Sequence, residues 1–108
     1  MPQRTLNETI KHSAHGQDFS IEVWSEDDCL AVYSFVEYGN ERKAVSPRYL
    51  ASYEVAYDYF QSNRAPISAH LIAIAKSDLD QQVYIEVSQG TIQEPVRIRA
   101  NLIGRPPA

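Results

Sequence analysis

The chain has 108 residues and a formal net charge of −4, and 44% of its residues are hydrophobic and 22% charged. These values are typical of one folded globular domain and exclude a disordered or fibrous protein. The acidic balance also argues against a general nucleic-acid binder, whose surface needs a basic stripe. We therefore expect a single domain over residues 1–108 and no nucleic-acid partner.

The cysteine content and the lengths of the apolar runs bear on the cellular compartment. Cys29 is the only cysteine, so no disulfide bond can form within the chain, which fits a reducing environment. The N-terminus is polar and lacks the apolar core of a signal peptide. Apolar runs such as Leu71 to Ala75 are far shorter than the roughly 20 residues of a membrane span. We expect a cytoplasmic protein with no membrane partner.

The N-terminal segment, residues 1–16, is mostly polar, with Leu6 and Ile10 as its apolar anchors after Met1. Its pattern is compatible with a short helix, a short strand or a mobile arm, and the sequence does not decide between them.

Three strands are predicted next. Apolar and polar residues alternate from Asp18 to Trp24, which predicts a half-buried strand. A turn at 25–28 then leads into Cys29 to Tyr38, which is apolar on both faces and predicts a more central strand. Gly39-Asn40 is a second turn signal, and it predicts a hairpin into a short third strand from Arg42 to Val45.

A helix is predicted to begin at Ser46-Pro47 and to run to about Ser62, with Asn63 as its terminator. A serine oxygen can satisfy free backbone N–H groups, and proline fits the first helical position. Four aromatic residues recur at the spacing i, i+4, i+8 and i+11, which places them on one helical face. We expect this face to be mostly buried, at a core edge or an interface. The four residues are Tyr49, Tyr53, Tyr57 and Phe60.

A second helix is predicted from Pro66 to about Asp78, because apolar residues recur at helical spacing and alanine is frequent. A buried strand through Leu71–Ala75 is the rival interpretation, since short apolar runs are ambiguous. Length and alanine content favour the helix.

The C-terminal part predicts an antiparallel pair of strands, Gln82–Ser88 and Pro95–Ile103, joined by a loop at 89–94. The register follows from the requirement that both apolar faces lie on the same side of the sheet. The outer-face contacts expected from this register are Glu86 with Arg97 and Tyr84 with Arg99.

The expected element order is therefore β-β-(β)-α-α-β-β. Grouped strands with a helical insertion predict an α+β fold, in which an antiparallel sheet of four to five strands has two helices packed on one face. The stretch Phe60 to Arg64, with Ile67 and Ala73 to Lys76, resembles the helical half of a family of small uncharacterised bacterial domains. The resemblance implies an α+β fold and, because that family has no assigned chemistry, implies no site.

Candidate metal ligands and nucleophiles are few. His12 and His15 have the spacing of two ligands on one helical turn, but a zinc site would need Cys29 or Asp18 as a third ligand. We interpret both histidines as polar residues of a mobile N-terminal segment. Cys29 follows the acidic stretch 26–28, whose charges disfavour a thiolate, so we expect it to be a packed residue at a strand start. No metal site is predicted.

His70 lies on the second predicted helix and could act as an acid or base, although an ordinary hydrogen-bonded residue is the more common case. The four glycines are isolated, so no phosphate-binding loop is formed, and the Gly-x-Ser-x-Gly motif of a nucleophile elbow is absent from the sequence. No cofactor or catalytic residue is predicted.

Two functional hypotheses remain. The first is a non-catalytic interaction module that forms a homodimer, or binds another protein, through the tyrosine-rich helix or an edge strand. The alternative is a small-molecule-binding protein or small enzyme, with an apolar pocket for a small apolar ligand. The candidate interface or pocket residues are Tyr49, Tyr53, Tyr57, Phe60 and His70.

Overall fold

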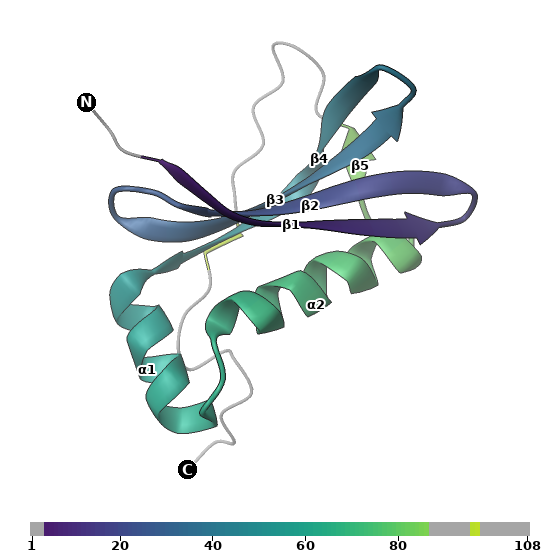
Figure 1. The fold of residues 1–108 in the computed structure, drawn as a ribbon. Coiled ribbons are helices and arrows are strands. Elements are labelled where there is room, and N and C mark those ends of the chain that lie inside the picture. The colour runs from purple at the N-terminus through teal and green to yellow at the C-terminus, as the bar shows by residue number, and fades with distance from the viewer. Residues whose placement is uncertain (1–3, 87–95, 98–108) are drawn as a thin grey trace.

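The computed structural model describes residues 4–86 and 96–97. In these residues two helices lie against one face of an antiparallel sheet (Figure 1). This confirms the expected α+β fold. The element order is β-β-β-β-α-α-β-β, so it has one N-terminal strand more than the sequence predicted.

The first four strands form an antiparallel meander in which each strand is hydrogen-bonded to the next. They are β1 (Thr5–Ala14), β2 (Gln17–Ser25), β3 (Cys29–Tyr38) and β4 (Glu41–Ser52). Neighbouring side chains of a strand point to opposite faces of a sheet, and here the helices cover only one face. The sheet therefore has an inner face, which packs on the helices, and an outer face, which they do not cover.

The segment that the sequence left undecided is the edge strand β1. Ile10, His12 and Ala14 point to the inner face and are half-buried, whereas the residues between them are exposed. The sequence shows little sign of this alternating burial, because Ile10 is the only strongly apolar residue of the three. An edge strand gains its order from hydrogen bonds with β2 as well as from burial.

The predicted start of the first helix at Ser46 is wrong. β4 continues through Pro47 to Ser52, and α1 spans Tyr53–Asn63. The alternation of buried Val45, Tyr49 and Ala51 shows why, since period-two burial against the core outweighs the local serine–proline signal. Proline is tolerated there because the β3–β4 register shifts beside it.

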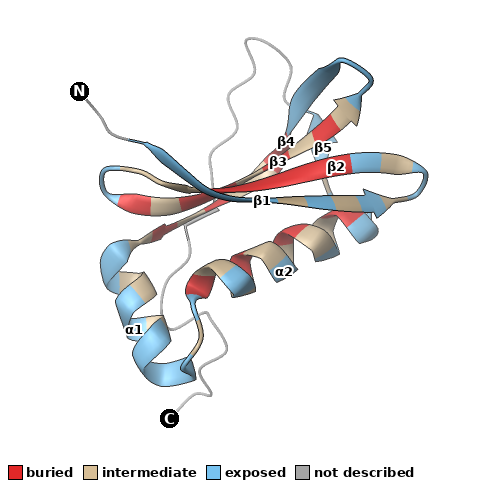
Figure 2. Cartoon of the chain, viewed as in Figure 1, coloured by how far each residue is buried: buried red, intermediate tan, exposed pale blue. Residues whose placement is uncertain are grey.

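The end of α1 and the whole of the second helix confirm the predictions. α1 ends at Asn63, and the left-handed Arg64 that follows donates its backbone N–H to the carbonyl of Phe60. α2 spans Ile67–Asp80 and lies along the inner face of the sheet (Figure 1). Its buried residues recur every four positions and form the stripe that faces the sheet in Figure 2. They are Ile67, Leu71, Ala75 and Leu79.

The predicted pairing of the C-terminal strands is wrong at the residues that can be compared. β5 (Ile85–Glu86) pairs antiparallel with β4 at Val45 and Ser46. β6 (Val96–Arg97) pairs parallel with β4 at Tyr49 and Leu50. Both therefore lie along one edge of β4, which is long enough for the two because it does not end at Val45. The expected Tyr84–Arg99 contact, the loop 89–94 and the rest of the last strand lie outside the described residues.

Glu86 contacts residues of β3 and β4. Its carboxylate accepts a hydrogen bond from the Tyr38 hydroxyl and lies 4.0 Å from Lys43 Nζ. The register places Glu86 opposite the core residue Val45, so its carboxylate is on the inner side of the sheet, contrary to the prediction, and is paired there with one group of β3 and one of β4.

The corrected start of α1 makes a testable prediction at Ser52. Its hydroxyl accepts a hydrogen bond of 3.1 Å from the backbone N–H of Val55, which caps the helix. We expect Ser52→Ala to lower the free energy of unfolding by about 1 kcal/mol, measured by urea denaturation. Ser13→Ala, a matched change in β1, should have a smaller effect because that serine is exposed. Equal losses at both positions would contradict the capping assignment.

Candidate interaction surface

The five candidate residues do not form one group. Tyr49 lies on β4 and is only 6% exposed, and its hydroxyl donates to a carboxylate oxygen of Asp78 on α2. Burial, together with the hydrogen bond and charge of Asp78, raises the pKa of Tyr49 above its ordinary value. This tyrosine is therefore a neutral core residue that ties β4 to α2, and it is not part of an accessible surface.

The other three rings lie on one face of α1, as predicted, but they are not buried. Tyr53, Tyr57 and Phe60 occupy positions i, i+4 and i+7 of the helix. Their exposed fractions are 42%, 65% and 46%. We call these three residues the aromatic face of α1. The expectation that they are mostly buried is wrong.

The exposure follows from how α1 packs. None of the residues of α1, all of which the structure describes, is fully buried. The helix contacts the core through the half-buried Val55, Ala56 and Tyr59, which lie on a different side from the aromatic face. Figure 2 accordingly shows α1 mostly in the colour of exposed residues. Only the Tyr53 hydroxyl is anchored, by donating to the backbone carbonyl of Glu26.

His70 lies apart from the aromatic face, between the two helices. Its imidazole packs on the ring of Tyr59, with centroids 5.6 Å apart and an angle of 33° between the planes. The residue thus joins α2 to the core-facing side of α1. His70 is thus a packing residue of the contact between the helices.

The two N-terminal histidines are ordered, contrary to the interpretation as members of a mobile segment. His12 Nε2 lies 2.7 Å from Asp80 Oδ1, and His15 Nε2 is hydrogen-bonded to the Asp80 backbone oxygen. Both imidazoles therefore bind the end of α2, where carbonyl groups lack helical partners. In residues 4–86 and 96–97, no cluster of three or more His, Cys, Asp or Glu side chains could hold a metal ion.

Cys29 behaves as predicted. It begins β3, is 2% exposed and lies 3.9 Å from a carboxylate oxygen of Glu26. A buried thiol beside a carboxylate is a poor nucleophile, so Cys29 is a packing residue.

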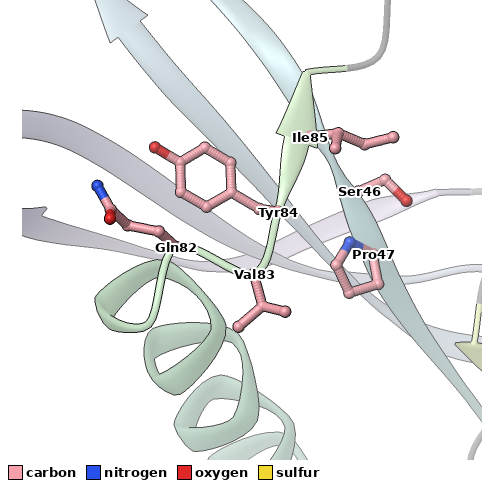
Figure 3. A pocket seen from close by; sticks show the side chains of 6 residues that line it. All are labelled: Ser46, Pro47, Gln82, Val83, Tyr84 and Ile85. Atoms are coloured by element: carbon pink, nitrogen blue, oxygen red, sulfur yellow. The ribbon is translucent and has the colours of Figure 1, made fainter.

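A shallow hollow of about 400 Å³ lies where the end of α2 meets β4 and β5 (Figure 3). Val83 and Ile85 at this hollow are 56% and 55% exposed. The Tyr84 ring lies on the opposite side of β5 from Ile85 in Figure 3, and it packs edge-on against Phe19. The sequence did not indicate this hollow, and His70 does not line it. The lining residues are Ser46, Pro47, Gln82, Val83, Tyr84 and Ile85.

Comparison with known proteins adds no functional information. No protein-family model, no curated protein and no solved structure matches the chain. The resemblance of the helical half to a family of small bacterial domains therefore stays a prediction. Neither α1 nor α2 has the length and hydropathy that a membrane crossing requires.

Proposed function

We propose that the protein is a non-catalytic interaction module that forms a homodimer through the aromatic face of α1. The observation that supports this proposal is the joint exposure of Tyr53, Tyr57 and Phe60 on one helical face. Tyrosine and phenylalanine are enriched at the centres of protein interfaces, where each ring buries a large area. Symmetric dimers are the most common oligomers.

The helix itself suggests how two copies would meet. In an antiparallel pair of α1 helices about a two-fold axis, Tyr57 would lie opposite Phe60 of the partner subunit. A second copy is thus complementary to this face in apolar area.

The test is the molar mass in solution. We expect light scattering to give a mass near twice the 12.2 kDa of one chain at high micromolar concentration. Tyr57→Ser and Phe60→Ser should each weaken the dimer about tenfold or more, as interface aromatic residues do. Asp58→Ser is the matched control, because this exposed residue of α1 lies one position from Tyr57 and two from Phe60 and so does not share their face of the helix. A monomer mass for the unmodified chain would refute the proposal.

A second candidate function is the binding of a small apolar ligand in the hollow beside Pro47. The exposure of Val83 and Ile85 at a hollow of about 400 Å³ favours it. If this function holds, the apolar dye Nile red should bind with increased fluorescence, and Val83→Asp should abolish the increase. Tyr57→Ser should leave the fluorescence unchanged. Equal binding to both variants would count against the hollow.

A further inference from the structure

The outer face of the sheet is stabilised by contacts among its own side chains. Glu22 and Trp24 alternate along β2 with residues of the core, so they lie on this face. Arg42 donates from Nη1 to Glu22 at 2.5 Å, and its Cζ atom lies 4.0 Å from the centre of the Phe35 ring. Trp24 Nε1 donates to Glu22 at 2.9 Å, and the Arg4 Cζ atom lies 4.2 Å from the centre of the Trp24 ring. The Glu22 carboxylate thus has its partners within the molecule.

The edge of the sheet at β1 is different. In residues 4–86 and 96–97, β1 pairs with β2 on one side, and no described strand pairs with its other side (Figure 1). An edge strand presents a row of backbone N–H and C=O groups that can pair with a further chain. β1 extends over 10 residues, so it is long enough to do so. We call the side of β1 away from β2 the free edge.

The turn between β1 and β2 shows which residues direct their backbone groups to the free edge. Its two residues, 15 and 16, are both in the left-handed region, so Ala14 and Gln17 face each other as a hydrogen-bonded pair. Such pairs alternate along an antiparallel ladder, and the register is unbroken back to position 8. The even-numbered residues therefore direct their backbone groups to β2. The odd-numbered residues direct theirs to the free edge, and they are Thr9, Lys11 and Ser13.

The side chains of β1 restrict which strand can pair there. The register sets Glu8 and His12 opposite residues of the core, so both lie on the inner face with the half-buried Ile10. A charge on the inner face of an edge strand opposes pairing with an arbitrary strand, because it would lie against an apolar neighbour. A partner strand must therefore carry a polar or positively charged residue opposite Glu8 and an apolar one opposite Ile10.

We propose that the free edge pairs with β1 of a second copy, antiparallel and about a two-fold axis at Ile10. Ile10 then lies opposite Ile10 of the partner subunit. Glu8 lies opposite His12 of the partner subunit, and the two charges are complementary when the imidazole is protonated. Thr9 exchanges backbone hydrogen bonds with Lys11 of the partner subunit, as the orientation of their backbone groups requires.

Other positions of the axis fit less well. An axis at Lys11 would place two like charges opposite each other, which destabilises a strand pair. An axis at Thr9 would place Glu8 opposite Ile10 of the partner subunit and would include the irregular pairing at position 7. An axis at His12 would leave Glu8 with no strand residue opposite it, since β1 ends at position 14. The axis at Ile10 satisfies both the apolar and the charged side chains.

This contact goes beyond the proposed homodimer, because it uses the edge of the sheet and not the aromatic face of α1. It pairs only about five residues of each copy, and small interfaces are weak. We therefore expect it to join copies at higher concentrations than those at which the aromatic faces associate. The two proposals fail independently, since Tyr57→Ser should leave the pairing of β1 unchanged.

Disulfide trapping tests the position of the axis. Ile10→Cys places two thiols opposite each other in a non-hydrogen-bonded pair, whose Cβ atoms are about 4.5 Å apart, close to the span of a disulfide bond. In a Tyr57→Ser chain at millimolar concentration, we expect oxidised glutathione to convert Ile10→Cys into a covalent dimer. The native Cys29 is 2% exposed and should not react. Ser13→Cys is the matched control, because its two copies would lie about 20 Å apart across the same axis.

The backbone pairing has its own test at position 9. Thr9→Pro, added to Ile10→Cys, should abolish the covalent dimer, because proline removes the N–H group that points to the partner. Thr9→Ala keeps this N–H group and should retain the covalent dimer. If Ile10→Cys does not fold, an equal mixture of Thr9→Cys and Lys11→Cys replaces it, since these exposed residues lie opposite each other in the proposed register.

Three results would overturn the proposal. One is a Ser13→Cys variant that cross-links as readily as Ile10→Cys, and another is the absence of a covalent dimer from both. The third is a faster cross-link of Ile10→Cys to a threonine–valine peptide containing one cysteine. That result would assign the free edge to strands of other proteins and would exclude a second copy as its preferred occupant.

Discussion

Replacing Leu71 with alanine is expected to lower the free energy of unfolding by about 2–5 kcal/mol. Leu71 is 0% exposed and lies in the middle of the α2 stripe that packs on the sheet. Truncation removes buried apolar area and leaves a cavity that the rigid sheet cannot fill. Domains of this size are commonly stable by only about 5–15 kcal/mol, so the loss would be a large fraction of the total.

The measurement is urea denaturation followed by far-ultraviolet circular dichroism. Leu6→Ala is the matched control, because it removes the same atoms from a leucine that is 45% exposed on β1. We expect the control to lose well under half as much stability as Leu71→Ala. Comparable losses at the two positions would contradict the assignment of the core to the α2–sheet interface.

The fold class and α2 could be predicted because their signals are periodic over many residues. The buried residues of α2 repeat every four positions over 13 residues, from Ile67 to Leu79. A strand interpretation of Leu71–Ala75 would have left that longer period unexplained. The hairpin from β2 to β3 was similarly clear, because an alternating run and an apolar run flank an acidic turn.

The junction of β4 and α1 could not be predicted from local signals. Ser46-Pro47 has the composition of a helix start, and the rings at 49, 53, 57 and 60 continue a helical spacing through it. The core instead selects the alternation of Val45, Tyr49 and Ala51, so the helix begins later. Because Tyr49 then belongs to the strand, only three rings remain on the helix. Their exposure depends on how α1 leaves the sheet, which no local pattern specifies.

The group of side chains around Glu22 on the outer face of the sheet is even harder to predict from the sequence. Arg4, Trp24 and Arg42 are far apart in the chain, and only the strand register brings their side chains together. One sign of this group is present in β2. The charged Glu22 lies between Ile21 and Val23 and is only 6% exposed. A buried carboxylate in such a position indicates cationic partners, but the sequence alone does not identify them.

Replacing Arg42 with alanine is expected to cost about 2–3 kcal/mol at neutral pH, because the buried Glu22 carboxylate would keep, among the described residues, only Trp24 as a hydrogen-bond partner. The cost lies below that of a fully buried ion pair because the Arg42 side chain is itself 45% exposed. Lys43→Ala, the next residue of β4, is the matched control. Its ion pair with Glu86 spans 4.0 Å between exposed groups and should contribute less than about 1 kcal/mol.

The pH dependence of the stability difference between the unmodified protein and Arg42→Ala distinguishes two roles of Arg42. One is its charge beside Glu22, and the other is its packing on Phe35. In the unmodified protein the pKa of Glu22 is below 4.5, so its stabilisation is complete above that pH and is lost as the pH falls through the folded-state pKa. Without Arg42, burial would raise the pKa of Glu22. The ionised carboxylate would then destabilise the fold at neutral pH, and protonation would relieve this. The stability gap between the two proteins should therefore narrow from pH 7 to pH 4, measured by urea denaturation.

The double variant Arg42→Ala with Glu22→Gln completes the test. A glutamine can still accept from Trp24 Nε1 but has no charge to bury, so part of the lost stability should return at neutral pH. The narrowing of the gap with falling pH should also disappear, because the group that titrates is gone. A gap that stays constant with pH, together with no recovery in the double variant, would mean that Arg42 acts by covering the Phe35 ring. Stabilisation of the outer face would then come from packing, and Glu22 would have no electrostatic role in it.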